Sequence, residues 1–288
     1  MDGKAAENGK KRGTLTRVKK CAVGIFGAGA VLYCAVLAFA AVFADRIIFP
    51  APIASYTESM EDLRFVPLSG GGKMAAVFLP SAKSDICVIY SHGNGEDLGR
   101  IKGVLSGYNT RGFNVLAYDY RGYGLTGGTA SQRALEECAD AAYDFAVKTL
   151  GFAPEKIAFV GYSLGSVPAA YSAAKHPDAK CAVIVGGIAG GVKTFLPFNI
   201  IPWQILMNVD NVKNIRIPTL FIHGMRDGVV NRRNVFENLA AAKNAPARLV
   251  KFEKFGHYNL HRTPEYWRET TDFINGKNNE KNSSITIR

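Results

Sequence analysis

The sequence predicts an α/β fold in which helices cover both faces of a mostly parallel, eight-stranded sheet, preceded by one transmembrane helix. Three observations lead to this prediction. Short apolar runs rich in β-branched residues recur between Gly, Pro and Asp residues, which is typical of buried strands in a parallel sheet. Stretches with apolar residues at helical spacing alternate with these runs, as crossover helices do. Residues 21–44 carry no charge and can form a helix of roughly 36 Å, longer than the ~30 Å hydrocarbon core of a bilayer.

The uncharged segment 21–44 is the expected membrane anchor. Residues 1–20 form a basic tail before it, and Asp45 follows it directly. The positive-inside rule then predicts a single-pass protein with a cytoplasmic N-terminus, whose residues 45–288 lie on the extracytoplasmic side. A cleaved signal peptide is the alternative, because residues 42–44 form an acceptable cleavage site, although the apolar run exceeds the usual length of about 7–15 residues.

Composition excludes several classes of protein. Hydrophobic residues make up 48% and charged residues 20% of the chain, so a large core can form and global disorder is excluded. The net charge is +11, but residues 1–20 hold +5 of it, so the charge is a poor argument for nucleic-acid binding. The five cysteines lie largely in apolar or strand-like runs, unlike those of a disulfide scaffold. No Cys/His spacing indicates a metal site, and we expect no cofactor.

The soluble part divides into three expected regions. Residues 45–62 form a tether stiffened by prolines, 63–276 the folded domain and 277–288 a polar tail. The expected strands are, in chain order, Arg64–Leu68, Lys73–Leu79, Ile86–Tyr90, Phe113–Tyr118, Ile157–Val160, Ala182–Val185, Thr219–Ile222 and Ala247–Phe252. The expected helices are Ser131–Leu150, Ser163–His176, Asn231–Lys243 and Thr263–Asn275, with Ser131 as the N-cap of the first.

A serine lies at a sharp turn between a strand and a helix. The segment Gly161-Tyr162-Ser163-Leu164-Gly165 follows the fifth expected strand and opens a helix of small residues. Glycines are needed at both flanks because a Cβ there would collide, and the turn presents the hydroxyl at the sheet edge. Ser163 is therefore the candidate nucleophile, and simple capping of the helix is its alternative role.

A serine hydroxyl is a weak nucleophile unless a base accepts its proton. Only five histidines are present, and His257 lies in a glycine-flanked loop after the last expected strand. Because that loop meets the same sheet edge as Ser163, His257 is the candidate base. Its alternative role is that of an ordinary loop or capping histidine.

The base in turn needs a carboxylate that fixes its tautomer. Asp227 follows the seventh expected strand and gives the chain order Ser, Asp, His. A plain turn residue is the alternative for Asp227, because Asp-Gly is common in turns. Asp119 competes, but it precedes the serine, and nearby Arg121 suggests a structural ion pair; Asp210 precedes its strand and is less well placed.

The oxygen that becomes negative during acyl transfer needs fixed N–H donors. The amide of Leu164, directly after the nucleophile, is one candidate. The glycine-rich segment Ser91–Gly95 follows another strand, and the amide of Asn94 is the second candidate. An ordinary glycine turn is the alternative for this segment.

Together these motifs resemble a known family. They are Ser91-His92-Gly93-Asn94, Tyr118-Asp119-Tyr120-Arg121-Gly122-Tyr123-Gly124, Ser163-Leu164-Gly165-Ser166-Val167-Pro168, Ile222-His223-Gly224 with Asp227, and Gly256-His257. Over about residues 47–275 the chain resembles an α/β-hydrolase of the serine-aminopeptidase-like superfamily, and within it the protein-depalmitoylase-like branch. The resemblance implies an α/β-hydrolase fold and a serine hydrolase activity. Cytosolic members of that branch resemble peripheral proteins held by acylated cysteines, whereas this chain carries a spanning run.

The resulting prediction is a membrane-anchored serine hydrolase that cleaves carboxylic esters or thioesters, such as those of a lipid or an acylated protein. A serine peptidase or amidase on the same scaffold is one alternative, and a non-catalytic anchored binding protein is another. The insertion between Ile188 and Ile215 is short, so we expect a minimal lid. Its apolar residues suit either an acyl-binding wall or plain core packing; they are Phe195, Phe198, Ile200, Ile201, Trp203, Ile205, Leu206 and Met207.

Overall fold

The structure is a computed structural model that describes residues 2–191, 206–277 and 283–287. It contains two compact units, Met1–Ile48 and Phe49–Arg288. The first unit is one helix, α1 (Asp2–Ile48). Within α1 the stretch Lys19–Phe39 is long and apolar enough to cross a membrane, with a mean hydropathy of 2.2 and none of its hydrophobic window buried.

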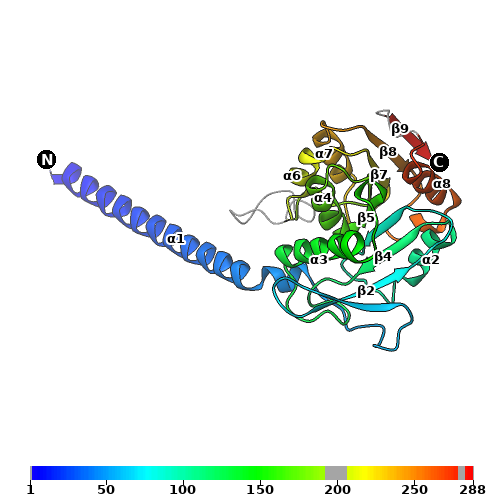
Figure 1. The fold of residues 1–288 in the computed structure, drawn as a ribbon. Helices are drawn as coiled ribbons and strands as arrows, with labels where there is room; N and C mark the ends of the chain where they lie inside the picture. The colour runs from blue at the N-terminus through cyan, green and yellow to red at the C-terminus, as the bar shows by residue number, and fades with distance from the viewer. Residues whose placement is uncertain (1, 192–205, 278–282, 288) are drawn as a thin grey trace. The chain divides into compact units, whose positions relative to one another are not determined.

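The second unit is built on a nine-stranded sheet in the order β1-β2-β4-β3-β5-β6-β7-β8-β9 (Figure 1). β2 runs antiparallel to both of its neighbours, and every other pair is parallel. The strands are β1 (Leu63–Pro67), β2 (Lys73–Leu79), β3 (Cys87–Ser91), β4 (Asn114–Tyr118), β5 (Ile157–Tyr162), β6 (Cys181–Val185), β7 (Thr219–Gly224), β8 (Ala247–Phe252) and β9 (Ser283–Ile287).

The eight strands expected from the apolar runs are all present, with ends that differ by at most two residues. The ninth, β9, corrects the expected count and lies in the segment 277–288 that was expected to be a polar tail. It pairs in parallel with β8, from Arg248 opposite Ser283 to Phe252 opposite Ile287. Pairing with an exposed strand edge satisfies backbone groups whatever the side chains are, so a mostly polar segment can join the sheet.

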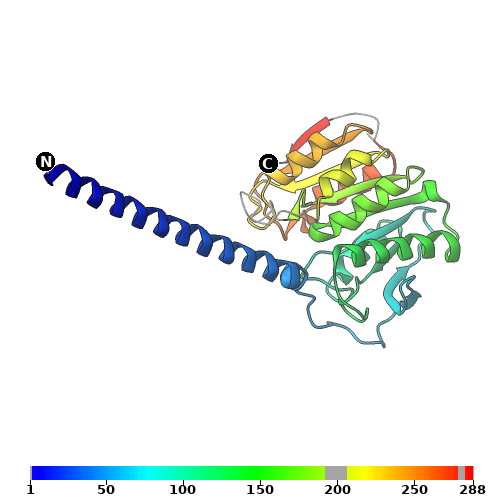
Figure 2. The same ribbon diagram turned by 90° about the vertical axis from the view of Figure 1, so that its left-hand side faces the viewer.

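Helices cover both faces of the sheet (Figures 1 and 2). On one face lie α2 (Lys102–Thr110) and α8 (Pro264–Ile274), joined by a 2.8 Å hydrogen bond between the hydroxyls of Tyr108 and Tyr266. On the other face α3 (Gln132–Asp144), α4 (Ser166–Lys175), α6 (Asn208–Asn214) and α7 (Arg233–Ala241) pack side by side. The described residues of this unit also form short helical turns: η1 (Phe145–Thr149), η2 (Pro154–Lys156), η3 (Ser163–Gly165) and η4 (Leu260–Arg262).

The expected N-cap of α3 is confirmed, because the Ser131 side chain accepts a hydrogen bond from the amide of Ala134 at 3.2 Å. The α3 helix continues as the π-helical turn η1, so helical structure covers nearly the whole of the expected range 131–150. Helices α2 and α6 were not expected from the sequence.

The end of the expected tether belongs to the second unit. Phe49 and Tyr56 are only 4% and 8% exposed. The Ser55 amide and hydroxyl donate to the two carboxylate oxygens of Asp97, at 2.6 and 2.5 Å. The chain is therefore fixed to the loop after β3 before the first strand begins.

Candidate active site

The chain passes from β5 into α4 through a strained turn at Ser163. Ser163 has a φ of +54°, in the left-handed region that a non-glycine residue occupies at a cost of about 1–3 kcal/mol. A Cβ on Gly161 would lie 2.3 Å from the carbonyl oxygen of Gly165, and a Cβ on Gly165 would lie 2.0 Å from that of Ser91. Both flanking positions therefore require glycine, for the steric reason expected from the sequence.

Ser163, His257 and Asp227 form one line of hydrogen bonds. His257 Nε2 lies 2.9 Å from Ser163 Oγ, and His257 Nδ1 lies 2.6 Å from Asp227 Oδ2. The other carboxylate oxygen of Asp227 accepts the amides of Val229 and Val230, each at 2.8 Å. The three side chains reach this line from the ends of β5, β8 and β7, which meet at one edge of the sheet.

The environment keeps Asp227 ionised. Burial acts to raise the pKa of Asp227, but the hydrogen bond and charge of His257 and the two amides outweigh it and leave that pKa below its ordinary value. Asp227 is therefore a carboxylate that can hold the Nδ1 proton of His257, which leaves Nε2 free to accept a proton from Ser163.

Three further residues shape the site: Gly186 was not expected from the sequence, and Tyr162 and His223 lie in the motifs named above but were given no role there. Gly186, directly after β6, has a φ of +56°, and a Cβ there would lie 3.3 Å from Cε1 of His257. Tyr162 donates its hydroxyl to the main-chain oxygen of His257 at 3.1 Å. His223, fully buried, has Nε2 3.8 Å from Asp227 Oδ2 and 3.1 Å from the carbonyl oxygen of Val230. Burial lowers the pKa of His223, so this ring is neutral beside the carboxylate.

The two candidate oxyanion donors come from adjacent loops. Ser91 is paired with Gly161 in the parallel register of β3 and β5, so the segment after β3 runs beside the turn that holds Leu164. The Asn94 side-chain oxygen accepts the hydroxyl of Tyr123. The Gly93 amide already donates to a carboxylate oxygen of Glu96, at 2.7 Å. The role of the Leu164 and Asn94 amides as oxyanion donors stays a prediction.

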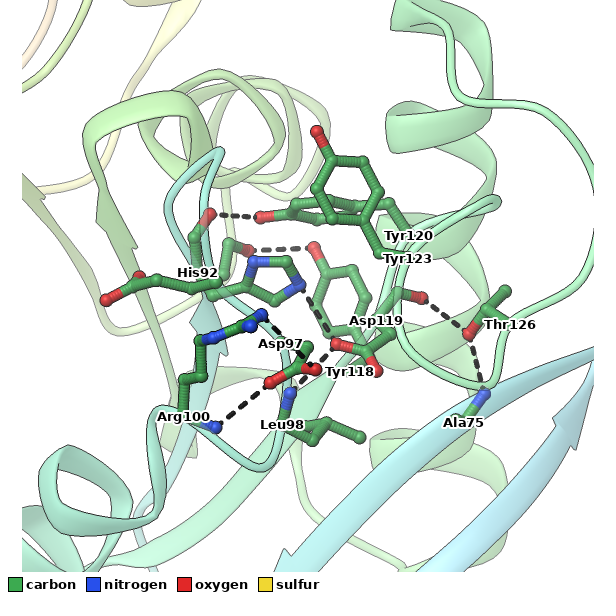
Figure 3. A network of polar contacts seen from close by, with 12 residues as sticks. Ala75, His92, Asp97, Leu98, Arg100, Tyr118, Asp119, Tyr120, Tyr123 and Thr126 are labelled. Atoms are coloured by element: carbon green, nitrogen blue, oxygen red, sulfur yellow. Dashed lines mark hydrogen bonds and ion pairs between the residues drawn. The ribbon is translucent and has the colours of Figure 1, made fainter. Parts of the chain in front are cut away.

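The competing aspartates have other partners. The expected ion pair between Asp119 and Arg121 is wrong, since Arg121 pairs at 2.6 Å with Glu137. Asp119 is instead fully buried with His92, whose Nε2 lies 3.1 Å from its Oδ1 (Figure 3). Asp210 is exposed on α6 and pairs with Lys213 at 2.8 Å.

Most apolar residues of the expected minimal lid lie outside the described residues. Of that set the structure describes Leu206, which is buried, and Met207, which is half-buried. The acyl-binding wall therefore stays a prediction.

The amino-acid sequence matches the family model "Serine aminopeptidase, S33" over residues 82–209. It is 29% identical over 220 residues to alpha/beta hydrolase domain-containing protein 17B of Xenopus laevis, covering 72% of each chain. It is 31% identical over 155 residues to alpha/beta hydrolase domain-containing protein aho-3 of Caenorhabditis elegans, covering 53% of this chain and 46% of that one.

Solved structures agree on the fold. The esterase Pf2001 of Pyrococcus furiosus superposes with a TM-score of 0.62 at 21% identity, covering 78% of this chain and 94% of that one. Est1E of Butyrivibrio proteoclasticus, solved with ferulic acid, superposes with a TM-score of 0.59 at 19% identity, covering 73% of this chain and 96% of that one. The chain thus has the α/β-hydrolase fold, and its sequence is similar to the serine-aminopeptidase family and to the alpha/beta hydrolase domain-containing 17 proteins.

Proposed function

We propose that the protein is a membrane-anchored enzyme that cleaves carboxylic esters or thioesters, with Ser163 as nucleophile, His257 as base and Asp227 as the carboxylate that orients the base. The observation that carries this proposal is the unbroken line of hydrogen bonds, 2.9 Å from Ser163 Oγ to His257 and 2.6 Å from His257 to Asp227. The line joins three loops far apart in the sequence, and its order matches the roles of a hydrolytic triad.

The reaction follows from these contacts. Ser163 Oγ attacks the acyl carbon while His257 Nε2 takes the hydroxyl proton, and the Leu164 and Asn94 amides donate to the oxyanion that forms. His257 then gives that proton to the leaving alkoxide or thiolate, which departs as alcohol or thiol and leaves an acyl-enzyme. Water attacks the acyl-enzyme, His257 takes its proton and returns it to Ser163, and the carboxylic acid is released.

Support for an ester or thioester substrate comes from the similar proteins. One superposed structure, Pf2001, is named an esterase, and another, Est1E, was solved with ferulic acid bound. The resemblance to the depalmitoylase-like branch adds acyl groups on proteins, or lipids, as candidate substrates. Because the same apparatus also cleaves amides, a peptidase is the competing activity.

Turnover by the full chain in detergent micelles tests this proposal. Nitrophenyl acyl esters, acyl thioesters and aminoacyl nitroanilides would be compared at equal concentrations. We expect hydrolysis of the esters and thioesters, lost in Ser163→Ala and kept in Ser172→Ala, which changes a buried serine of α4 away from the turn. Faster turnover of the amides would indicate a peptidase. Absence of turnover in a folded wild-type chain would favour the binding protein.

The anchoring part of the proposal rests on the apolar stretch Lys19–Phe39 of α1. With basic residues before this stretch, the hydrolase unit should lie on the extracytoplasmic side. In sealed vesicles with the cytoplasmic face outward, added protease should leave residues 45–288 intact until detergent is present. Digestion without detergent would contradict this orientation, and a purified chain that starts at Asp45 would indicate a cleaved signal peptide instead.

A further inference from the structure

A buried histidine lies directly beside the segment that carries the second candidate oxyanion donor. His92 is completely buried, and its Nδ1 lies 2.9 Å from the carbonyl oxygen of Gly93. Its Nε2 lies 3.1 Å from Asp119 Oδ1 (Figure 3). A carbonyl and a carboxylate both only accept hydrogen bonds, so both ring nitrogens face acceptors. Burial lowers the pKa of His92, but the hydrogen bond and charge of Asp119 outweigh it and leave that pKa above its ordinary value.

The contact with the Gly93 carbonyl also orients the Asn94 amide. The carbonyl of Gly93 and the N–H of Asn94 belong to one peptide unit, and no described peptide bond is cis. In a planar trans peptide the C=O and the N–H point in opposite directions. When the His92 Nδ1–H holds the carbonyl on one side, the Asn94 N–H must point to the other side.

Asp119, which lies on the other side of the His92 ring from Gly93, is fixed as well. The Asp119 carboxylate accepts the amide of Leu98 at 3.0 Å and the hydroxyl of Tyr56. The Asp119 main-chain oxygen accepts the hydroxyl of Thr126 at 3.1 Å. Asp119 therefore cannot follow a movement of His92, and the ring is held between two anchored acceptors.

The main chain of His92 is also tied down. Its carbonyl oxygen accepts the hydroxyl of Tyr120 at 2.7 Å. The segment His92–Asn94 is thus restrained at the His92 carbonyl, at the Gly93 carbonyl and, through the Tyr123 hydroxyl, at the Asn94 side chain.

We propose that His92, braced by Asp119, is a positioning residue of the hydrolase: it fixes the Gly93–Asn94 peptide so that the Asn94 N–H is oriented toward the oxyanion. This inference rests on the proposed function, because it assigns His92 a role in the same acyl transfer. His92 acts through the peptide and does not touch the reacting atoms. Its effect should therefore appear in kcat, where the oxyanion forms, more than in KM.

Two substitutions separate this role from general support of the fold. Asparagine places its amide nitrogen near the position of Nδ1 and can still donate to the Gly93 carbonyl. Glutamine places its amide nitrogen near Nε2 and can still donate to Asp119, but not to Gly93. We therefore expect His92→Gln to lower kcat about 10–100-fold with KM within about threefold, and His92→Asn to stay within about fivefold of wild-type kcat.

The measurements are kcat and KM of the full chain on a nitrophenyl ester, together with Tm. The concentration of active sites, needed for kcat, is obtained by titration to completion with a fluorophosphonate. Equal losses of kcat in both variants, a larger loss in His92→Asn, or a ranking that simply follows Tm would overturn the inference. If either variant fails to fold, Tyr120→Phe decides: it removes only the hydroxyl that holds the His92 carbonyl, and we expect about fivefold lower kcat at unchanged KM. Wild-type kcat in Tyr120→Phe would then overturn it.

Failure of the proposed function would look different. In that case Ser163→Ala would keep wild-type turnover, or the wild-type chain would show none. A wrong assignment of His92 alone would leave the wild type active, Ser163→Ala inactive and the two His92 variants alike.

Discussion

Replacing Gly186 with alanine is the sharpest perturbation of the candidate triad that leaves its three side chains in place. Gly186 follows β6, next to the imidazole of His257. A methyl group there would lie 3.3 Å from Cε1 and 3.4 Å from Nδ1 of His257, and 3.8 Å from Asp227 Oδ2. The first of these distances is shorter than an ordinary van der Waals contact and the second is at its lower limit, so the imidazole must move away by a few tenths of an ångström.

Two effects follow, of different size. Gly186 has a φ of +56°, and an L-residue in this left-handed region costs about 1–2 kcal/mol. For a folded unit of this size that cost lowers Tm by about 2–8 °C. The displaced imidazole weakens proton transfer from Ser163, and a misplacement of this kind lowers kcat about 10–100-fold with little change in KM.

Gly151→Ala is the matched control. Gly151 has a φ of +78°, but no atom lies within 4 Å of the position that its Cβ would take, so the variant carries the backbone cost alone. Both variants should lose similar amounts of Tm by calorimetry, and only Gly186→Ala should lose ester turnover. Wild-type kcat in Gly186→Ala, or equal losses of kcat in the two variants, would show that the position of the His257 ring does not depend on Gly186.

Two further predictions follow from the charges of Asp227 and Glu137. Asp227→Asn should lower kcat about 10²–10⁴-fold at nearly unchanged KM, because an amide facing His257 Nδ1 favours the tautomer that cannot accept the serine proton. Measuring kcat and KM for ester hydrolysis by this variant and the wild type would check this. Glu137 has a pKa of about 2, chiefly through its hydrogen bond to Arg121, below the roughly 4.3 of an unfolded chain. Its pairing should therefore stabilise the fold above about pH 4.3, and this contribution is lost as pH falls through about 2. Glu137→Gln should flatten the fall of Tm between these pH values, and an unchanged profile would contradict the assignment.

Strands β3 to β8 were predictable because a parallel sheet is covered on both faces, so each of these strands is a largely apolar run that can be recognised in the sequence alone. Helix α2 was not predictable in this way. It contains Gly103 and Gly107, which are poor helix formers. A Cβ on Gly107 would lie 2.3 Å from the Trp267 ring, so the packing of α8 explains a glycine that local preference disfavours.

The candidate site likewise contains residues that could be predicted from the local sequence and residues that only the fold brings together. Ser163 and its glycines could be predicted because the constraint is local to one turn. Gly186 could not, since its Cβ is excluded by His257, about 70 residues away in sequence, and only the order of β6, β7 and β8 brings them together. The partner of Arg121 was mistaken for the nearest acid in sequence, whereas the fold brings Glu137 on α3 within 2.6 Å.

One measurement tests the identity of the nucleophile without any assumption about the substrate. The full chain would be treated with a fluorophosphonate, digested with trypsin and analysed by tandem mass spectrometry. The tryptic peptide from Ile157 to Lys175 contains Ser163, Ser166 and Ser172, so fragment ions can distinguish them. We expect a single adduct on Ser163. An adduct on another residue, or an unmodified Ser163 in a chain that hydrolyses esters, would contradict this expectation.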